Sequence, residues 1–72
     1  MTADTRTLAD ALPAEQARVR ALMPLYREIG IAGRPALFLM ERSLAAADRA
    51  VMSGDVIAML QAYEDLKGYA DD

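Results

Sequence analysis

Cysteine is absent from a chain of only 72 residues, and this absence limits how its fold can be stabilised. A chain of this length buries only roughly 60% of the surface that its unfolded form exposes, so a core alone leaves a thin margin of stability. Disulfides and thiolate zinc sites, two of the usual supplements, need cysteine. The remaining supplement is association with a second copy or with another protein. The length allows one domain and excludes a second.

Histidine is absent as well, which removes the commonest metal ligand and the commonest general base. A nucleophilic serine at Ser43 or Ser53 would need Lys67 as its base, because no histidine can activate it. The acidic side chains have no spacing typical of a calcium loop. We therefore expect a protein that is not an enzyme and that has no catalytic, cofactor-binding or metal-binding residues.

The composition favours helices. Hydrophobic residues make up 54% of the chain, which is far too many for a disordered protein. Alanine occurs 15 times, leucine nine times and methionine five times, whereas valine and isoleucine occur three times each. Strong helix formers therefore outnumber the β-branched residues that strands prefer. The expected fold class is all-α, with three helices in a single domain over residues 10–68.

The first helix is expected between Asp10 and about Ile29. Asp10 can cap its N-terminus, and Pro13 is tolerated in the opening turn. Residues 1–9 are expected to form a flexible N-terminal segment. Pro24 removes one helical hydrogen bond and is expected either to kink this helix or to split it, and both alternatives stay open. Its apolar positions have helical spacing: Val19, Leu22, Leu25, Tyr26 and Ile29.

The second and third helices are expected over about residues 35–52 and 56–67. Gly30 is expected as a left-handed residue after the first helix, and Pro35 in the first turn of the second. Gly54 can end the second helix, and Asp55 can cap the third. Because the connecting turn is so short, we expect these two helices to form an antiparallel αα-hairpin. The packing of the first helix on this hairpin stays open, and residues 69–72 are expected to form a short acidic tail.

The expected second helix is apolar on more than one side at its start. A helix with such a profile is either central or partly covered by another chain. The apolar content is also large for so short a chain, so we expect part of it on the surface as an interface. The candidate interface residues are Leu37, Phe38, Leu39, Met40 and Tyr63. The predicted function is a small non-catalytic protein–protein interaction module that forms a homodimer and binds a second protein.

Charge is unevenly distributed along the chain, whose net charge is −3. Residues 13–34 contain four arginines and two glutamates, whereas residues 55–72 contain five acidic residues and one lysine. Weak attraction between the first and third helices is one interpretation, and contacts with a charged partner through Arg20, Arg27 and Arg34 are another. The alternative function is a small regulator that binds nucleic acid through the arginines of the first helix. The net charge and a pI of about 4.7 count against it.

No targeting or membrane segment is recognisable in the sequence. Residues 1–12 lack the continuous apolar region of a signal peptide. The longest apolar run is Pro35 to Met40, and it is far shorter than the ~20 residues that span a bilayer. We therefore expect a cytoplasmic protein with no membrane contact.

Two resemblances can be stated from residue patterns. The run from Ala47 to Asp55, followed by Met59, Leu60, Ala62 and Tyr63, resembles the junction between two tetratricopeptide helices and implies a helical hairpin. No second copy of it occurs, so it implies no repeat protein. The order Tyr26 to Gly30, Glu41 to Asp48, Ser53 to Asp55 and Tyr63 to Lys67 is similar to small uncharacterised helical proteins of phages and prophages. That second resemblance implies a phage or prophage origin, so the expected protein partner is a host or phage protein. It implies no defined activity or site residues.

Overall fold

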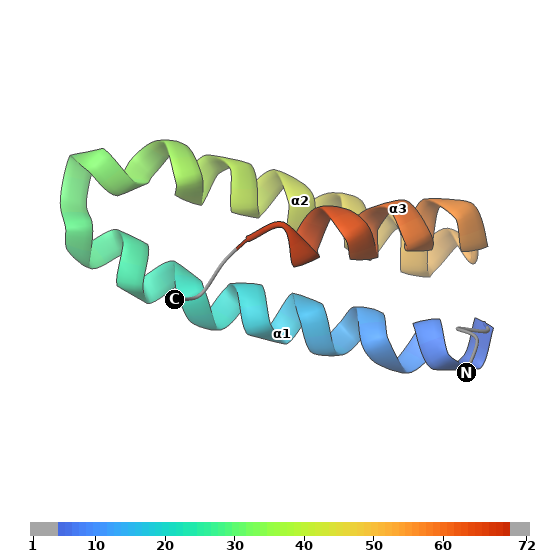
Figure 1. The fold of residues 1–72 in the computed structure, drawn as a ribbon. Helices are drawn as coiled ribbons and strands as arrows, with labels where there is room; N and C mark the ends of the chain where they lie inside the picture. Colours follow the sequence, from blue (N-terminus) through green and yellow to red (C-terminus); the bar gives the residue numbers. More distant parts are fainter. Residues whose placement is uncertain (1–4, 70–72) are drawn as a thin grey trace.

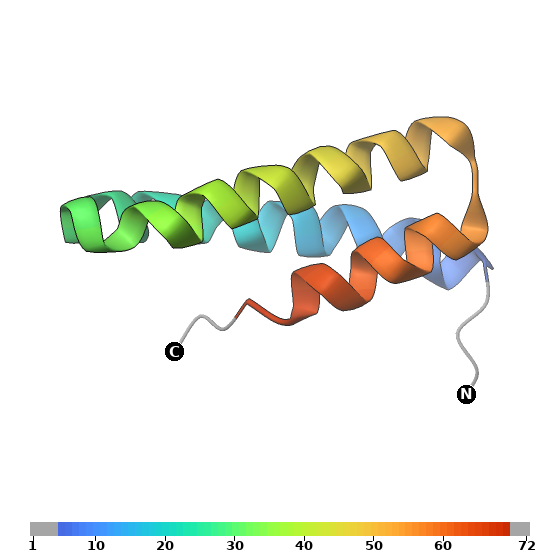
Figure 2. The ribbon, with the colours of Figure 1, turned by 90° about the horizontal axis from the view of Figure 1, so that it is seen from above.

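The computed structural model describes residues 5–69, with side chains from Leu8 onward. It contains α1 (Thr5–Ile29), the short 3-10 helix η1 (Gly30–Gly33), α2 (Arg34–Ser53) and α3 (Val56–Lys67). Figures 1 and 2 show α1 and α2 side by side and antiparallel, with α3 returning from the end of α2 along both. No strand occurs within residues 5–69, so the predicted all-α class is confirmed.

The first helix begins earlier than the sequence predicts. α1 starts at Thr5, so the prediction of a flexible segment is wrong for residues 5–9, and residues 1–4 lie outside the described part. Leu8 and Leu12 are both buried in the core, and their burial stabilises this extra helical length. Asp10 is therefore not a cap, and Pro13 lies inside the helix instead of in its first turn.

Pro24 does not divide α1. The helix continues through it to Ile29, so the alternative of two short helices is wrong. Leu22 and Met23 are buried beside it, and Tyr26 is partly buried against the same core. This packing on both sides of the proline holds the helix together although one backbone hydrogen bond is missing.

The connection between α1 and α2 depends on two glycines. Gly30 has a φ of +86°, the left-handed conformation predicted for it. Gly33 is buried, and a side chain there would collide with the backbone carbonyl of Tyr26. α1 and the start of α2 can therefore approach closely only with glycine at this position. Pro35 lies in the first turn of α2, as predicted.

The turn between α2 and α3 follows the sequence prediction closely. Gly54 has a φ of +70°, and its N–H donates to the carbonyls of Ala50 and Val51. The Asp55 carboxylate accepts hydrogen bonds from the backbone N–H groups of Ile57 and Ala58, at 3.1 and 3.2 Å. The predicted cap is thus confirmed, and α3 has the predicted bounds.

The core lies where all three α-helices meet. Its fully buried large side chains are Leu12 and Val19 of α1, Met40 of α2 and Leu66 of α3. Ala47, Ala50 and Ala62 are buried beside them, and their small size lets the helices pack closely. Met40 has no exposed surface, so the prediction that it belongs to an interface is wrong. It belongs to the core cluster, whereas its neighbour Leu39 is half exposed.

Two side chains of α1 fix its position through polar contacts. Nη2 of Arg18 donates to the Leu66 carbonyl at 3.0 Å, which satisfies an acceptor at the end of α3. Nε2 of Gln16, a buried side chain, donates to Oδ1 of Asp48 in α2 at 2.7 Å. These contacts join α1 to both helices of the hairpin and settle the packing that the sequence leaves open.

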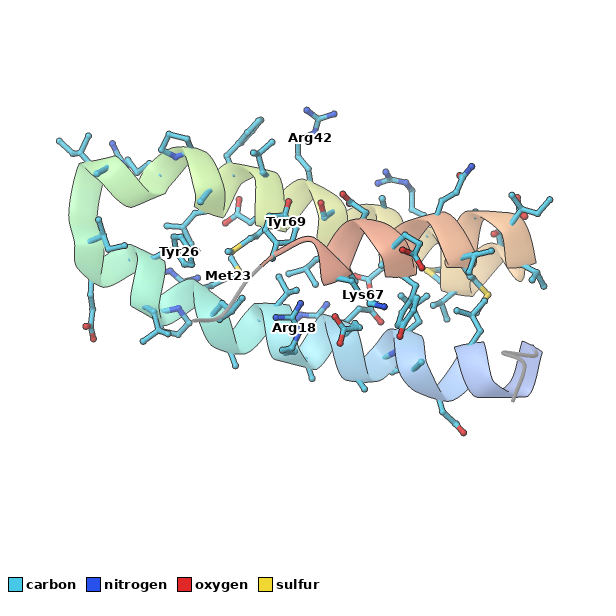
Figure 3. All side chains as sticks on the ribbon, viewed as in Figure 1. Arg18, Met23, Tyr26, Arg42, Lys67 and Tyr69 are labelled. Carbon is cyan, nitrogen blue, oxygen red and sulfur yellow. The ribbon has the colours of Figure 1, made fainter. Side chains whose placement is uncertain are left out.

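The chain continues to pack after α3 ends. Tyr69 follows α3 (Figure 3) and is partly buried against the core. Its hydroxyl lies 2.9 Å from Oγ of Ser43. The prediction of an acidic tail over residues 69–72 is therefore wrong for Tyr69, and residues 70–72 lie outside the described part. The aromatic ring covers apolar surface just beyond the last turn of α3.

Replacing Met40 with alanine distinguishes its role in the core from a role on the surface. We expect Met40→Ala to lower the free energy of unfolding by about 2–5 kcal/mol, because it leaves a cavity. Leu39→Ala is the matched control, with an expected loss of roughly 1 kcal/mol or less, since Leu39 is already half exposed. Urea unfolding monitored by circular dichroism measures both. Equal losses for the two variants would contradict the assignment.

The Asp55 cap can be tested with one substitution. We expect Asp55→Ala to lower the free energy of unfolding by about 1 kcal/mol, because two N–H groups at the start of α3 lose their acceptor. Glu64→Ala, an exposed position within α3, is the control and is expected to change stability by less than about 0.5 kcal/mol. Thermal unfolding compares the variants, and an unchanged midpoint for Asp55→Ala would refute the cap.

Candidate interaction surface

Many large apolar side chains lie on the outside of the described structure. Met52, Ile31 and Ile57 are 86%, 81% and 70% exposed, which is close to the exposure of an unfolded chain. Other large hydrophobic residues are about half exposed, and they come from all three α-helices: Leu25, Ile29, Phe38, Leu39, Val51, Val56 and Leu60. Where such side chains lie next to one another, they are candidates for a contact with another molecule.

The short length of α3 explains part of this exposure. α3 has 12 residues, whereas α1 has 25 and α2 has 20. Figure 1 shows that α3 ends near the middle of the α1–α2 pair, so within residues 5–69 α3 does not cover the end of this pair that contains η1. Leu25 and Ile29 belong to the predicted apolar stripe of α1 but extend past the end of α3. They are exposed because α3 ends at Lys67 and does not extend over them.

A different apolar line runs along the outer face of α2. Phe38, Ala45 and Met52 are all exposed and are spaced seven residues apart, which is close to two helical turns. The guanidinium of Arg42 lies 5.8 Å from the centre of the Phe38 ring, so it stacks on this line from the side. We call these three residues the outer seam of α2.

The predicted interface residues are divided by the structure. Phe38 and Leu39 are exposed, whereas Leu37 and Tyr63 are partly buried against the core. Met40 is fully buried, as described above. The apolar residues at the start of α2 therefore include exposed ones, as predicted. Apolar character alone does not show which of them point outward and which point into the core.

The predicted charged contacts also have different environments. Nη2 of Arg20 lies 3.6 Å from Oδ2 of Asp48, so Arg20 already has a partner on α2. Arg27 and Arg34 are exposed. Attraction between the first and third helices is one interpretation of the charge pattern, but the Arg20–Asp48 pair joins α1 to α2. Both side chains of that pair are more than half exposed, so its contribution to stability is small.

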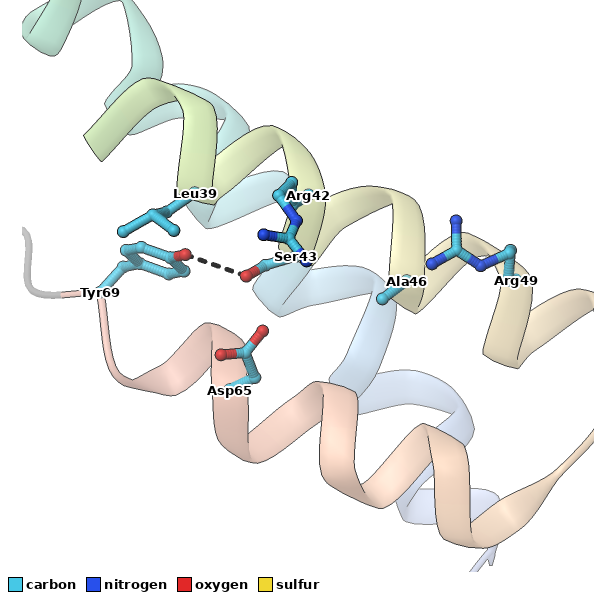
Figure 4. A pocket seen from close by; sticks show the side chains of 7 residues that line it. All are labelled: Leu39, Arg42, Ser43, Ala46, Arg49, Asp65 and Tyr69. Carbon is cyan, nitrogen blue, oxygen red and sulfur yellow. Dashed lines mark hydrogen bonds between the residues drawn. The ribbon is translucent and has the colours of Figure 1, made fainter. Parts of the chain in front are cut away.

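A shallow cleft of about 370 Å³ separates α2 from the end of α3. Figure 4 shows Arg42 and Arg49 along its α2 side, Asp65 on its α3 side and Tyr69 at one end. The hydroxyl groups of Ser43 and Tyr69 are hydrogen-bonded to each other inside this cleft. A smaller cleft of about 300 Å³ shares Ala46 and Asp65 with the first. The clefts are open to solvent and do not enclose a ligand.

Sequence reasoning misses two features of this surface. It identifies Met52 only as the last residue of the second helix. The available signal is its spacing: Met52 follows Ala45 by seven residues, which places both on the same face of the helix. It also assigns Tyr69 to the tail. Tyr69 comes three residues after Leu66, and an aromatic side chain at that spacing is a signal that packing against the core continues beyond the helix.

Within residues 5–69, no group of three or more acidic side chains is placed to hold a metal ion. No helix in this part of the chain is both long enough and apolar enough to cross a membrane. Comparison of the chain with protein-family models, with curated proteins and with solved structures gives no match.

Proposed function

We propose that this protein is a non-catalytic protein–protein interaction module that self-associates through exposed apolar side chains of its helices. The observation that carries the proposal is the set of large hydrophobic residues on its surface, above all Met52, Ile31 and Ile57. Moving one such side chain from water to a fully buried site contributes roughly 1.5–3 kcal/mol of favourable free energy. A second copy supplies that burial to those side chains that lie at the contact between the two copies, whereas a single chain of this size does not.

The filled core supports the same proposal. Leu12, Val19, Met40 and Leu66 already occupy the space between the helices with no exposed surface. Among the described residues, no buried side-chain nitrogen or oxygen lacks a hydrogen bond, so the core has no polar defect that a rearrangement would correct. The exposed hydrophobic residues therefore cannot turn inward without displacing residues that pack well.

A catalytic function has less support from the site. The polar groups of the α2–α3 cleft include two arginines, one aspartate and a hydroxyl pair, but the chain has no histidine or cysteine to act as base or nucleophile. Binding of nucleic acid is the second candidate from the sequence. It has less support because Arg20 is engaged by Asp48 and the chain carries a net charge of −3.

Self-association can be measured directly. Sedimentation equilibrium from about 5 to about 500 μM covers the range of weak protein–protein affinities. We expect the average mass to rise with concentration from the 7.8 kDa of one chain toward twice that value. A mass that stays at 7.8 kDa over the whole range would refute the proposal. A gel-shift assay with duplex DNA at low salt tests the nucleic-acid alternative, and no shift is expected.

A further inference from the structure

The outer face of α2 has exposed apolar side chains at its centre and charged side chains along both edges. The outer seam of Phe38, Ala45 and Met52 is exposed, whereas Met40 and Ala47 of the same helix are fully buried. A helix that pairs with another helix in a coiled coil has apolar residues at two positions of each heptad, with charged residues beside them. The outer seam supplies one of these two positions three times in succession, between charged residues on both sides. Ala45, at the centre of the seam, leaves room for a second helix to approach closely.

One edge of the seam is acidic, and contacts with α1 define its side. Asp48 accepts a hydrogen bond from Gln16 and pairs with Arg20, both of which belong to α1. Glu41 lies seven residues before Asp48, so both are on the same side of α2. The acidic edge therefore runs along the side of α2 that is nearer to α1.

The other edge is basic, and it lies on the side of α3. Arg42 and Arg49 line the cleft between α2 and α3, as Figure 4 shows. These arginines are also seven residues apart, at nearly the same heights along the helix as Glu41 and Asp48. The seam thus has an acidic edge and a basic edge of equal length.

This arrangement distinguishes two ways of pairing α2 with a copy of itself. In a parallel pair related by a two-fold axis along the helices, each acidic edge meets the basic edge of the other copy. In an antiparallel pair related by a two-fold axis across the helices, Arg42 meets Arg49 and Glu41 meets Asp48. Opposite charges across a helix interface favour one orientation, and like charges oppose the other.

We propose that α2 pairs in parallel with the α2 of a second copy, with the outer seam at the centre of the interface. This inference rests on the self-association proposed above and names the surface and the orientation. Phe38, Ala45 and Met52 each meet the same residue of the second copy. Glu41 pairs with Arg42 of the second copy, and Asp48 extends its contacts to Arg49 of the second copy.

The charged groups are available for these contacts. The side chains of Glu41 and Arg49 make no hydrogen bond or ion pair within residues 5–69, and the Arg42 side chain is engaged only in stacking on Phe38. Asp48 is already bound to Gln16 and Arg20, so the Glu41–Arg42 contact is the main determinant of orientation. One helix from each copy gives an interface below the roughly 800 Å² per partner of a standard complex, so we expect a weak dimer in the micromolar range.

Exchanging the two charges tests the orientation. Glu41→Arg alone places like charges together twice in the dimer, and we expect the dissociation constant to rise about tenfold. The double variant Glu41→Arg/Arg42→Glu restores opposite charges and is expected to return to within about threefold of the original value. Antiparallel pairing predicts a different result for the double variant. Its dissociation constant would then be lower than that of the original chain, because the exchanged charges at positions 41 and 42 would face Asp48 and Arg49 of the second copy.

Mixing the double variant with the original chain gives a second readout. In a parallel mixed dimer, Glu41 of the original chain faces the negative charge that Arg42→Glu introduces in the variant. Native mass spectrometry with one isotopically labelled chain should therefore show fewer mixed dimers than random association gives. An excess of mixed dimers would overturn the proposal. Circular dichroism and thermal unfolding of each variant verify that the fold of the single chain is unchanged.

Single cysteines locate the contact, because the chain has none of its own. In a parallel pair Met52 lies next to Met52 of the second copy, so Met52→Cys should form an intermolecular disulfide rapidly under mild oxidation. Ile31→Cys is the control, since Ile31 is almost as exposed but lies in η1, outside the seam. Equal rates for the two variants would overturn the proposed interface.

The outcomes separate this inference from the proposed function. A chain that remains monomeric in sedimentation refutes both. A dimer whose affinity is unchanged by Glu41→Arg, and in which Met52→Cys crosslinks no faster than Ile31→Cys, leaves self-association in place and refutes the parallel pairing of α2.

Discussion

The burial of Leu66 between α1 and α2 is the contact on which the rest of the structure depends. Leu66 has no exposed surface, and its carbonyl accepts a hydrogen bond from Arg18, so the end of α3 is fixed to α1 by both apolar and polar contacts. α3 ends one residue later, at Lys67. Among the described residues, the core therefore has side chains from three helices at one end of the molecule, whereas α3 does not reach the end near η1. The exposed residues Leu25 and Ile29 are a direct result of this difference in length.

The chain compensates for the short third helix at Tyr69. This residue turns back onto the core, and its hydroxyl bonds to Ser43, so an aromatic ring takes the place that another turn of helix would have covered. The bond satisfies the buried Ser43 of α2, and the ring closes one end of the α2–α3 cleft. Leu39 remains half exposed beside it, which shows that the cover is incomplete.

The proposed function follows from surface that the fold leaves uncovered. A short chain without disulfides has a small margin of stability, and association adds to that margin by burying surface that one chain exposes. The outer seam of α2 is distinct from the surface left by α3, because it faces away from the core and carries charged edges of both signs. Apolar burial supplies affinity at such a seam, whereas the charges decide the orientation of the partner.

Local signals in the sequence determined the helical class, the glycine at the end of α1, the turn at Gly54 and the Asp55 cap, because each depends on the backbone preferences of a few adjacent residues. The early start of α1, the continuity through Pro24 and the burial of Met40 were decided only by the tertiary structure, because they depend on which helix packs against which face. The sequence analysis grouped Leu39 and Met40 as interface candidates because the start of the second helix is apolar on more than one side. Packing in the three-helix core then buried Met40 and left Leu39 outside, since adjacent residues on a helix point about 100° apart.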